Sequence, residues 1–542
     1  MKRRNILKGL SLLPFAGAAT AFKSYAAADD KNIIGAAGDF FDEQNIFRTI
    51  GVEPIINCRG TFTIIGGSIE RPEVRAAMEA ASKNFIQYDE LADGIHKRLA
   101  EITGAEWALV SAGCAAGLKH VTAACVTGGN PEKLTRIPNL EGFDKTEVVI
   151  PSSSRNVYDH AIRNIGVRVI TVDTLAQMEA ALNERTAMIY LMAFDEAQPG
   201  NEFTLENVSK IARPKNIPVL IDAAAEVLTI PNVHLQKGAD IVAYSGGKAI
   251  CGPQCAGLVL GKKNILMSAW QASSPHHGPG RDNKVGREEM MGMLAAVEAW
   301  TKRDHAAEWK TWLGYLDNIS KKLTAIPGVT ASVFEPTELS NRSPVLNVSW
   351  DPAKFNITGA EMAELVGRSK PRIAIGSDDK DGQAAIDITT GQMQPGNDVI
   401  VANRLYEVLT AKRSPKVTTM AVPTVNLSGS WEATIQFFSS TSKHMLFIEQ
   451  DGKWIKGAHK GDFTVRELTG EVESNTSVKM RSTERRPGDS VTFIFTGNIS
   501  TDTISGSIYM GEYRTATFTA KRTSYKITPG SITVPGGPPL AT

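Results

Sequence analysis

The feature that most constrains this fold is a series of short apolar runs, separated by stretches of helical periodicity, between residues 57 and 325. Helical segments are expected between several runs, for example at 174–182 and 205–212. Short β-rich runs that alternate with helices are typical of a mainly parallel sheet covered on both faces. The runs expected to form strands are residues 107–110, 148–150, 167–172, 188–192, 219–221, 241–244 and 257–260.

The 542 residues are too many for one hydrophobic core, because domains usually hold ~100–200 residues. We expect an α/β large domain at 57–325, preceded by a polar arm at 29–56. Residues 326–412 alternate short strands with two helices, which predicts a small α+β domain. The following stretch at 413–424 is rich in Ser, Pro, Lys and Thr and indicates a linker.

Residues 425–525 carry a purely β pattern of eight short strands, and a tail at 526–542 follows. Asp451-Gly452 is a hairpin turn signal within this pattern. Closing the sheet removes exposed edges, so the pattern favours a small antiparallel up-and-down barrel over an open sheet. The opening Gly429-Ser430-Trp431 resembles that of lipocalin-like barrels.

Residues 1–28 follow the order of an export signal. The paired Arg3 and Arg4 precede an apolar stretch at 10–22, and small residues lead up to Ala28. This order predicts a twin-arginine signal peptide cleaved near Ala28 and a periplasmic mature protein, with an uncleaved anchor or an amphipathic tail as alternatives. The apolar stretch is shorter than the ~20 residues of a membrane-spanning helix, so the mature chain is expected to have no such span.

The charge balance argues against nucleic acid as a partner. Five basic and no acidic side chains lie in residues 1–28, so the remainder has 54 basic against 58 acidic side chains. A mildly acidic chain lacks the basic surface that phosphate backbones require. The five cysteines are odd in number and form no CxxC pair, which predicts neither a zinc site nor a full disulfide framework.

Lys248 lies in a Gly-rich loop that begins at Ser245 and separates two expected strands. Ammonium groups are rarely held inside a protein unless chemistry or a partner compensates for their burial. The loop is not a phosphate P-loop, because the GxxxxGK[ST] spacing is absent. A solvated loop lysine is the alternative for this segment alone.

Asp222 follows the apolar run 219–221 and precedes Lys248 by 26 positions. A carboxylate at the carboxyl end of a strand faces the crevice where α/β sheets bind ligands. Such a buried Asp can keep a pyridinium nitrogen protonated, although a helix N-cap is the alternative.

A third motif follows the run 107–110 and opens a helix. Free backbone N–H groups and the helix dipole at this point suit an anionic phosphate, and small side chains let the phosphate come close. Small residues also permit tight helix packing, which is the alternative here. The candidate phosphate-binding residues are Ser111, Gly113, Cys114 and Ala115.

A phosphate turn, an Asp and a Lys, each after a strand and in this order, match the layout of fold-type I pyridoxal 5'-phosphate (PLP) enzymes. Residues 57–409 resemble the selenocysteine-synthase-like branch of the aminotransferase class-V group, whose relatives include amino-sugar-acid lyases. The resemblance rests on the three motifs and on residues 277–289. It implies that Lys248 holds PLP as a Schiff base, that Asp222 binds the pyridine nitrogen, and that the protein is a homodimer or larger.

The resemblance also suggests secondary site residues. Tyr158 and His160 lie where related enzymes place a side chain against the cofactor ring, with a surface helix as the alternative. Arg281, Lys284 and Arg287 form a basic cluster that could meet a substrate carboxylate or a cofactor phosphate from the neighbouring subunit, with solvated charges at a helix start as the alternative. Apart from the resemblance, Arg372 in the small domain is a candidate for a bidentate carboxylate clamp.

The expected reaction is elimination or replacement on an amino acid or amino-sugar acid through a quinonoid, with Lys248 as general base at the Cα proton. Transamination or racemisation would use the same residues. A non-catalytic envelope binding module is the alternative from another class. The export signal and the missing tRNA-binding region argue against selenocysteine synthesis.

Overall fold

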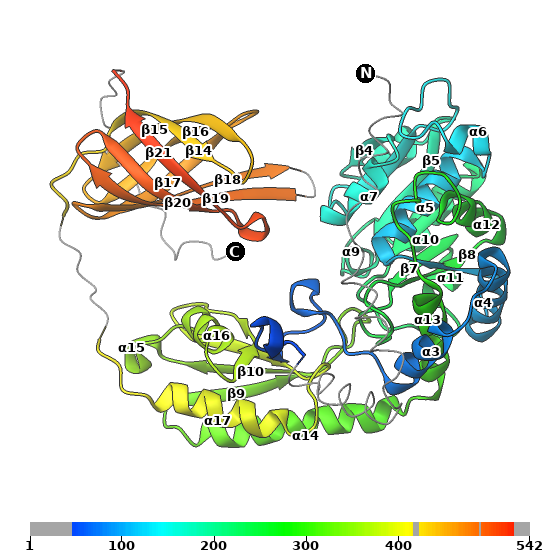
Figure 1. The fold of residues 1–542 in the computed structure, drawn as a ribbon, viewed down its shortest axis with the longest axis horizontal. Coiled ribbons are helices and arrows are strands. Elements are labelled where there is room, and N and C mark those ends of the chain that lie inside the picture. The colour runs from blue at the N-terminus through cyan, green and yellow to red at the C-terminus, as the bar shows by residue number, and fades with distance from the viewer. Residues whose placement is uncertain (1–45, 416–421, 487–488, 525–542) are drawn as a thin grey trace, which may run out of the picture. The chain divides into compact units, whose positions relative to one another are not determined.

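The computed structural model describes residues 46–415, 422–486 and 489–524 (Figure 1). The predicted signal peptide, most of the predicted arm and the predicted tail lie outside these residues. The chain divides into two units by its contacts. The first holds the described residues up to Gly60 with Ala306–Glu335 and Ser343–Lys412, and the second holds Thr61–His305, Pro336–Arg342 and the described residues from Arg413 onward.

A seven-stranded sheet forms the centre of the second unit, in the order β2-β8-β7-β6-β5-β3-β4. β8 runs antiparallel to both its neighbours and the other pairs are parallel, so the sheet is mixed. Strands in the middle of the sheet are buried on both faces, which explains why their sequences are continuous apolar runs. The strands are β2 (Trp107–Ser111), β3 (Glu147–Pro151), β4 (Arg168–Val172), β5 (Thr186–Met192), β6 (Val219–Asp222), β7 (Ile241–Ser245) and β8 (Gly257–Gly261).

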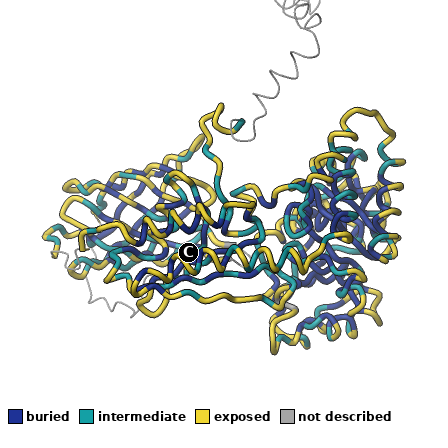
Figure 2. The backbone as a smooth tube through the Cα atoms, turned by 90° about the horizontal axis from the view of Figure 1, so that it is seen from below, coloured by how far each residue is buried: buried dark blue, intermediate teal, exposed yellow. Residues whose placement is uncertain are grey.

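Helices pack against this sheet, and Figure 2 shows buried chain concentrated inside the layers. Side-chain caps begin several of the helices; Thr204, for example, accepts a hydrogen bond from the N–H of Asn207. The helices are α3 (Pro72–Ser82), α4 (Tyr88–Thr103), α5 (Cys114–Thr127), α6 (Pro131–Leu134), α7 (His160–Arg163), α8 (Leu175–Ala181), α9 (Ala193–Glu196), α10 (Leu205–Ala212), α11 (Val233–Lys237), α12 (Lys263–Ala272) and α13 (Arg287–Lys302), with the 3-10 turns η3 (Thr63–Ile65), η4 (Val157–Asp159) and η5 (Arg213–Lys215).

The first unit is the small α+β part, with an antiparallel sheet in the order β12-β13-β10-β9 and a separate core. A second, two-stranded sheet pairs β1 in parallel with β11, so the end of the predicted arm belongs to this unit. The helix α14 also belongs here, and its Asn318 donates to Asp398 of α17 at 2.7 Å. The elements are η2 (Arg48–Ile50), β1 (Ile55–Asn57), α14 (His305–Thr324), β9 (Val329–Phe334), β10 (Val345–Trp350), α15 (Pro352–Phe355), α16 (Gly359–Arg368), β11 (Arg372–Ala374), β12 (Gly376–Ser377), β13 (Ala384–Thr389) and α17 (Asn397–Thr410).

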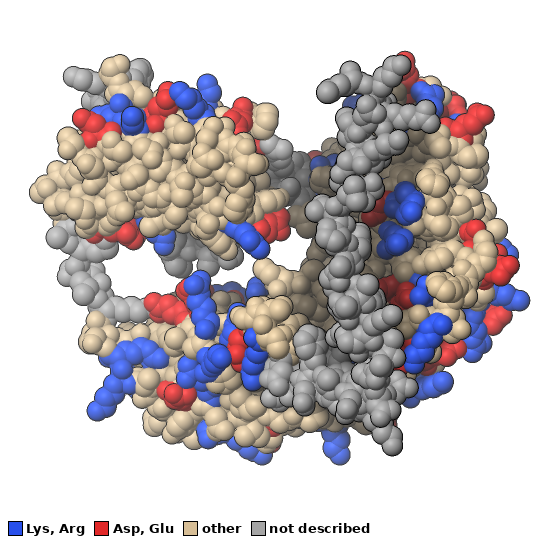
Figure 3. Space-filling view, viewed as in Figure 1, with Lys and Arg blue, Asp and Glu red and all other residues tan. Residues whose placement is uncertain are grey.

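Eight consecutive antiparallel strands close into a barrel when β14 pairs with β21, as predicted for this part of the chain. Alternating residues fill the interior and give the barrel a core of its own, which includes Trp431 and Phe495. Figure 3 shows acidic and basic side chains along the edges of the visible face of the barrel, with other residues covering its middle. The elements are β14 (Gly429–Gln436), β15 (Thr441–Asp451), β16 (Trp454–Lys460), β17 (Val465–Ser474), β18 (Ser477–Arg486), β19 (Asp489–Ser500), β20 (Thr503–Tyr509), η6 (Gly511–Tyr513) and β21 (Thr515–Arg522).

A series of hydrogen-bonded polar side chains is buried inside the barrel. His444 and His459 share a hydrogen bond of 2.7 Å between Nδ1 and Nε2, and His459 Nδ1 lies 2.6 Å from Ser482 Oγ. Burial lowers the pKa of His459 to about 3 and also lowers the pKa of His444. Arg466, which pairs with Glu484, lies in the same interior, and its positive charge also lowers the pKa of both histidines.

We therefore expect the barrel to lose stability as the pH falls below 6.5. The unfolded chain takes up protons on both histidines near that pH, whereas the folded barrel resists protonation, so acid favours unfolding. Hydrogen exchange in β15 and β16 of the full chain measures the effect. Protection should fall between pH 6.5 and 4.5, and His459→Gln should weaken this dependence. Equal pH dependence in both proteins would contradict the expectation.

Candidate active site

Asp222 ends β6 and is almost fully buried, with 3% of its surface exposed. The hydroxyl of Tyr190 in β5 donates to Oδ2 at 2.9 Å. The N–H of Ala224 donates to Oδ1 at 3.1 Å, and Cys114 Sγ lies 3.5 Å from the same oxygen. The strand register pairs Met192 with Asp222, which brings β5 alongside the carboxylate. Donors from three elements therefore hold Asp222.

Two opposing effects set the protonation of Asp222. Burial raises its pKa, while the Tyr190 hydrogen bond, the Ala224 N–H, the charge of Lys248 and the Cys114 thiol lower it. Burial also raises the pKa of Tyr190 and of Cys114 well above their ordinary values, so both side chains keep their protons and remain donors. The segment after Asp222 forms a turn, which removes the alternative of a helix N-cap.

The backbone just before Lys248 is fixed by close packing and hydrogen bonds. The Gly246 N–H donates to the carbonyl of Ala256 at 2.8 Å, and the Ser68 N–H donates to Gly247 at 3.0 Å. A Cβ at Gly247 would lie 2.5 Å from Cα of Gln254, so only glycine fits there. Lys248 itself is half-buried, and its charge acts on both Asp222 and Cys114. The structure thus brings the predicted lysine and aspartate into one site.

The start of α5 offers donors for an anion. Gly113 precedes the helix with a φ of +85°, and no side chain caps the helix start. The N–H groups of the first turn have no acceptors within the helix. The first N–H that has one belongs to Gly117 and donates to the Gly113 carbonyl at 3.2 Å. Ala115 is exposed at this end, while Ser111 is buried with its hydroxyl on the Gly113 carbonyl. An anion-binding turn, a buried carboxylate and a primary amine match the phosphate, ring nitrogen and aldehyde of PLP. The residues present therefore fit this cofactor.

Gly257 in β8 offers a test of the turn that precedes α5. A Cβ at this position would lie 2.5 Å from the Gly113 carbonyl carbon and 2.7 Å from the Cys114 nitrogen. Because both are backbone atoms, Gly257→Ala should displace the turn and weaken PLP binding about tenfold. Fluorescence titration of the apoprotein measures this. Gly94→Ala, where nothing lies within 4 Å, is the control, and equal affinities in the two variants would contradict the predicted role.

The remaining predicted cofactor residues lie near the same strand ends. Ser245 ends β7 and is half-buried, and its N–H donates to Ala224 at 3.4 Å. Tyr158 in η4 and His160 at the start of α7 are both exposed. The hydroxyl of Tyr190 connects their loop to Asp222, because Asn156 donates to it at 2.9 Å.

The predicted substrate residues differ in how their side chains are used. Arg281 is exposed and donates to Ser274 at 3.3 Å, and Lys284 is exposed. Arg287 donates to carbonyls at the end of α3, so its guanidinium supports a helix terminus. Arg372 lies in β11 of the first unit and donates to the Gly367 carbonyl at 2.8 Å. These contacts do not gather the four residues into one cluster.

Tyr190 and Asn156 are site residues that the sequence did not reveal. Tyr190 interrupts an apolar run with a hydroxyl group, and a buried hydroxyl usually has a partner. This signal predicts that a partner exists and leaves its identity open. The contact with Asp222 becomes visible only when β5 and β6 are paired.

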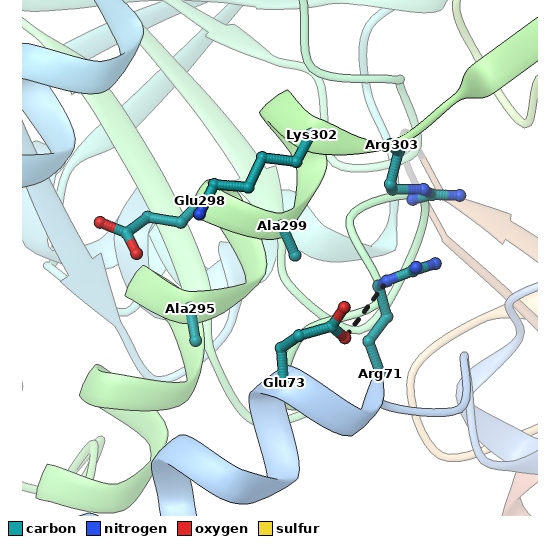
Figure 4. A pocket seen from close by; sticks show the side chains of 7 residues that line it. All are labelled: Arg71, Glu73, Ala295, Glu298, Ala299, Lys302 and Arg303. Atoms are coloured by element: carbon teal, nitrogen blue, oxygen red, sulfur yellow. Dashed lines mark ion pairs between the residues drawn. The ribbon is translucent and has the colours of Figure 1, made fainter.

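A separate pocket of about 310 Å³ lies between the start of α3 and the last turns of α13 (Figure 4). Arg71 and Glu73 form an ion pair of 3.7 Å in it, and Arg303 donates to the carbonyl of Ala249, next to Lys248. The pocket contains none of the residues around Asp222, so we place the chemistry at the Asp222 site. Its lining residues are Arg71, Glu73, Ala295, Glu298, Ala299, Lys302 and Arg303.

No group of three or more His, Cys, Asp or Glu residues in the described part of the chain is arranged to hold a metal ion. None of the described helices has the length and apolar character needed to cross a membrane. None of the five cysteines forms a disulfide; two of them, Cys58 and Cys114, are buried, and Cys255 is exposed.

Comparisons with known proteins agree with this geometry. A family model described as aminotransferase class-V matches residues 158–285. D-glucosaminate-6-phosphate ammonia lyase of Salmonella typhimurium is 29% identical over 299 residues, which cover 53% of this chain and 78% of that protein. A solved structure of D-glucosaminate-6-phosphate ammonia-lyase has a TM-score of 0.60 and 25% identity, and the match covers 67% of this chain and 98% of that one.

Two further relatives carry different names. 5'-C-glycyluridine monooxygenase-decarboxylase of a Streptomyces species is 27% identical over 374 residues, which cover 67% of this chain and 92% of that protein. L-seryl-tRNA(Sec) selenium transferase of Moorella thermoacetica is 25% identical over 334 residues, which cover 52% of this chain and 65% of that protein.

Proposed function

We propose that this chain, which is a fold-type I PLP-dependent enzyme of the aminotransferase class-V group, catalyses elimination or replacement on an amino acid or amino-sugar acid. The observation that carries the proposal is the buried Asp222 carboxylate, held by Tyr190 and within electrostatic reach of Lys248. The similarity to an ammonia lyase for an amino-sugar acid supports elimination as the reaction and an amino-sugar acid as the substrate class.

Each of the chain's groups has a task in this reaction. When bound, PLP supplies an electron sink for the electron pair left at Cα of an amino substrate. The first turn of α5 would hold the phosphate, and Asp222 would accept a hydrogen bond from the ring nitrogen. The Lys248 amine would hold the cofactor aldehyde and, with substrate bound, would remove the Cα proton as general base. Burial around Asp222 keeps water from competing for this carboxylate.

Product analysis tests the proposed reaction class. Amino acids and amino-sugar acids, including phosphorylated ones, are offered to the purified enzyme with PLP. Release of ammonia and a keto acid supports elimination. Transfer of the amino group to an added keto acid would indicate transamination instead. Loss of optical rotation without release of ammonia would indicate racemisation. Lys248→Ala is the control, because any product that it still forms comes from cofactor chemistry that does not need this lysine.

We also propose that the chain is exported by the twin-arginine route. The order of basic, apolar and small residues in positions 1–28 supports this proposal. Because the route recognises the arginine pair, replacing Arg3 and Arg4 by lysine should leave the protein in the cytoplasm. Cell fractionation measures the distribution, and unchanged export of the double variant would refute the proposal.

A further inference from the structure

Tyr190 is a fully buried tyrosine whose hydroxyl is the junction of a hydrogen-bonded chain. Its oxygen accepts from Asn156 Nδ2 at 2.9 Å and lies 2.9 Å from Asp222 Oδ2. The sulfur of Met192 is also near, at 3.1 Å, but a hydroxyl has one proton to donate. A carboxylate is the stronger acceptor, so that proton points to Asp222.

The contacts of Asp222 differ in strength. Among the effects that oppose its burial, the Tyr190 hydrogen bond is the largest, ahead of the Ala224 N–H, the Lys248 charge and the Cys114 thiol. Both Ala224 and Cys114 contact Oδ1, whereas Tyr190 is the donor to Oδ2. The direction of the Tyr190 hydrogen bond therefore determines where the remaining lone pair of Oδ2 points and can accept another hydrogen bond.

Asn156 fixes the direction of the tyrosine hydroxyl and at the same time shapes a loop. Its Nδ2 also donates to the Ser154 carbonyl at 2.9 Å, and its Oδ1 accepts from the Tyr158 N–H at 2.8 Å. Ser154 Oγ in turn accepts from the Met192 N–H at 3.1 Å. The chain from Asn156 to Asp222 thus ties the loop after β3 to β5 and β6.

We propose that Tyr190, oriented by Asn156, is a positioning residue that holds the Asp222 carboxylate ready to receive the ring nitrogen of the cofactor. The proposal rests on the role that the proposed function gives to Asp222. Tyr190 acts through Asp222 and contacts neither substrate nor the reacting atoms. Removing its hydroxyl should therefore alter how the ring nitrogen is held and leave substrate recognition largely intact.

The test is Tyr190→Phe in the PLP-loaded enzyme and in the apoprotein. Without its main donor the carboxylate is protonated more easily, so the acid limb of the kcat profile should move to higher pH. We expect kcat to fall about 10- to 100-fold with little change in KM. The apoprotein should bind pyridoxine 5'-phosphate, which has no aldehyde, about tenfold more weakly.

Tyr244→Phe is the matched control. Tyr244 lies in β7, which pairs with β6 on the side opposite β5, and it is also fully buried. Its hydroxyl accepts from Asn232 at 2.7 Å without contacting Asp222. Its loss should leave the acid limb and the affinity for pyridoxine 5'-phosphate unchanged. Equal values for Tyr190→Phe and Tyr244→Phe would overturn the proposal.

Two more variants keep the test decisive. Asn156→Leu keeps the Tyr190 hydroxyl but removes the amide that donates to it. It should shift the acid limb of the kcat profile to higher pH, by a smaller amount than Tyr190→Phe. This variant tests the proposal even if Tyr190→Phe fails to fold, and an unchanged acid limb would contradict it. Asp222→Asn separates failure of the proposed function from failure of the positioning role. If this variant binds pyridoxine 5'-phosphate as tightly as the wild type, the proposed function fails. If it binds much more weakly while Tyr190→Phe is unchanged, only the positioning role is refuted.

Discussion

Lys248→Ala should lower turnover by about 10⁴-fold or more, because it removes the side chain proposed both to bind the cofactor covalently and to act as general base at Cα. PLP should still bind noncovalently through the start of α5 and Asp222. The expected result is thus an inactive protein that releases its cofactor on dialysis. Steady-state kinetics and the absorbance of the dialysed protein measure both effects.

Lys210→Ala is the control for this variant. Lys210 is an exposed lysine of α10, so its loss should change neither turnover nor cofactor retention. Wild-type turnover in Lys248→Ala would contradict the proposed mechanism. Restoration of part of the activity by added primary amines would support the assignment of a base to this position.

Asp222→Asn should lower kcat by about 10²- to 10³-fold, because it removes the charge proposed to stabilise a protonated ring nitrogen while keeping the shape of the side chain. The link between Lys248 and the cofactor should survive, since Asp222 has no part in forming it. Absorbance should therefore report a bound cofactor in a protein that turns over slowly.

Glu226→Gln provides a matched comparison for Asp222→Asn. Glu226 is a buried carboxylate four residues further along, and it lies 2.6 Å from His234 Nε2. Its replacement should lower stability and leave kcat near the wild-type value. Loss of the covalent cofactor link in Asp222→Asn, or an equal fall of kcat in both variants, would argue against the role given to Asp222.

The sequence predicted much of the fold because its patterns are local. Seven apolar runs became the strands of the central sheet, and the eight-stranded pattern after residue 425 became a closed antiparallel barrel. The resemblance to class-V and selenocysteine-synthase-like PLP enzymes is confirmed by the comparisons. The barrel's likeness to lipocalins stays a prediction, as does the homo-oligomer.

What escaped prediction depends on contacts between distant parts of the chain. Tyr190 and Asn156 lie 34 positions apart, and only the pairing of β5 with its neighbours brings them to Asp222. Helix α14 was expected within the large domain, but its apolar face contributes to the core of the first unit. The antiparallel direction of β8 likewise depends on its partners β2 and β7.

Borohydride reduction of the PLP-loaded protein, followed by peptide mapping, tests the central claim most directly. Reduction makes the bond between the cofactor and its lysine permanent, so the labelled peptide identifies the residue. We predict label on Lys248 alone, both in the wild-type protein and in Asp222→Asn. Label on any other lysine of the wild-type protein, or none at all, would contradict the assignment of this site.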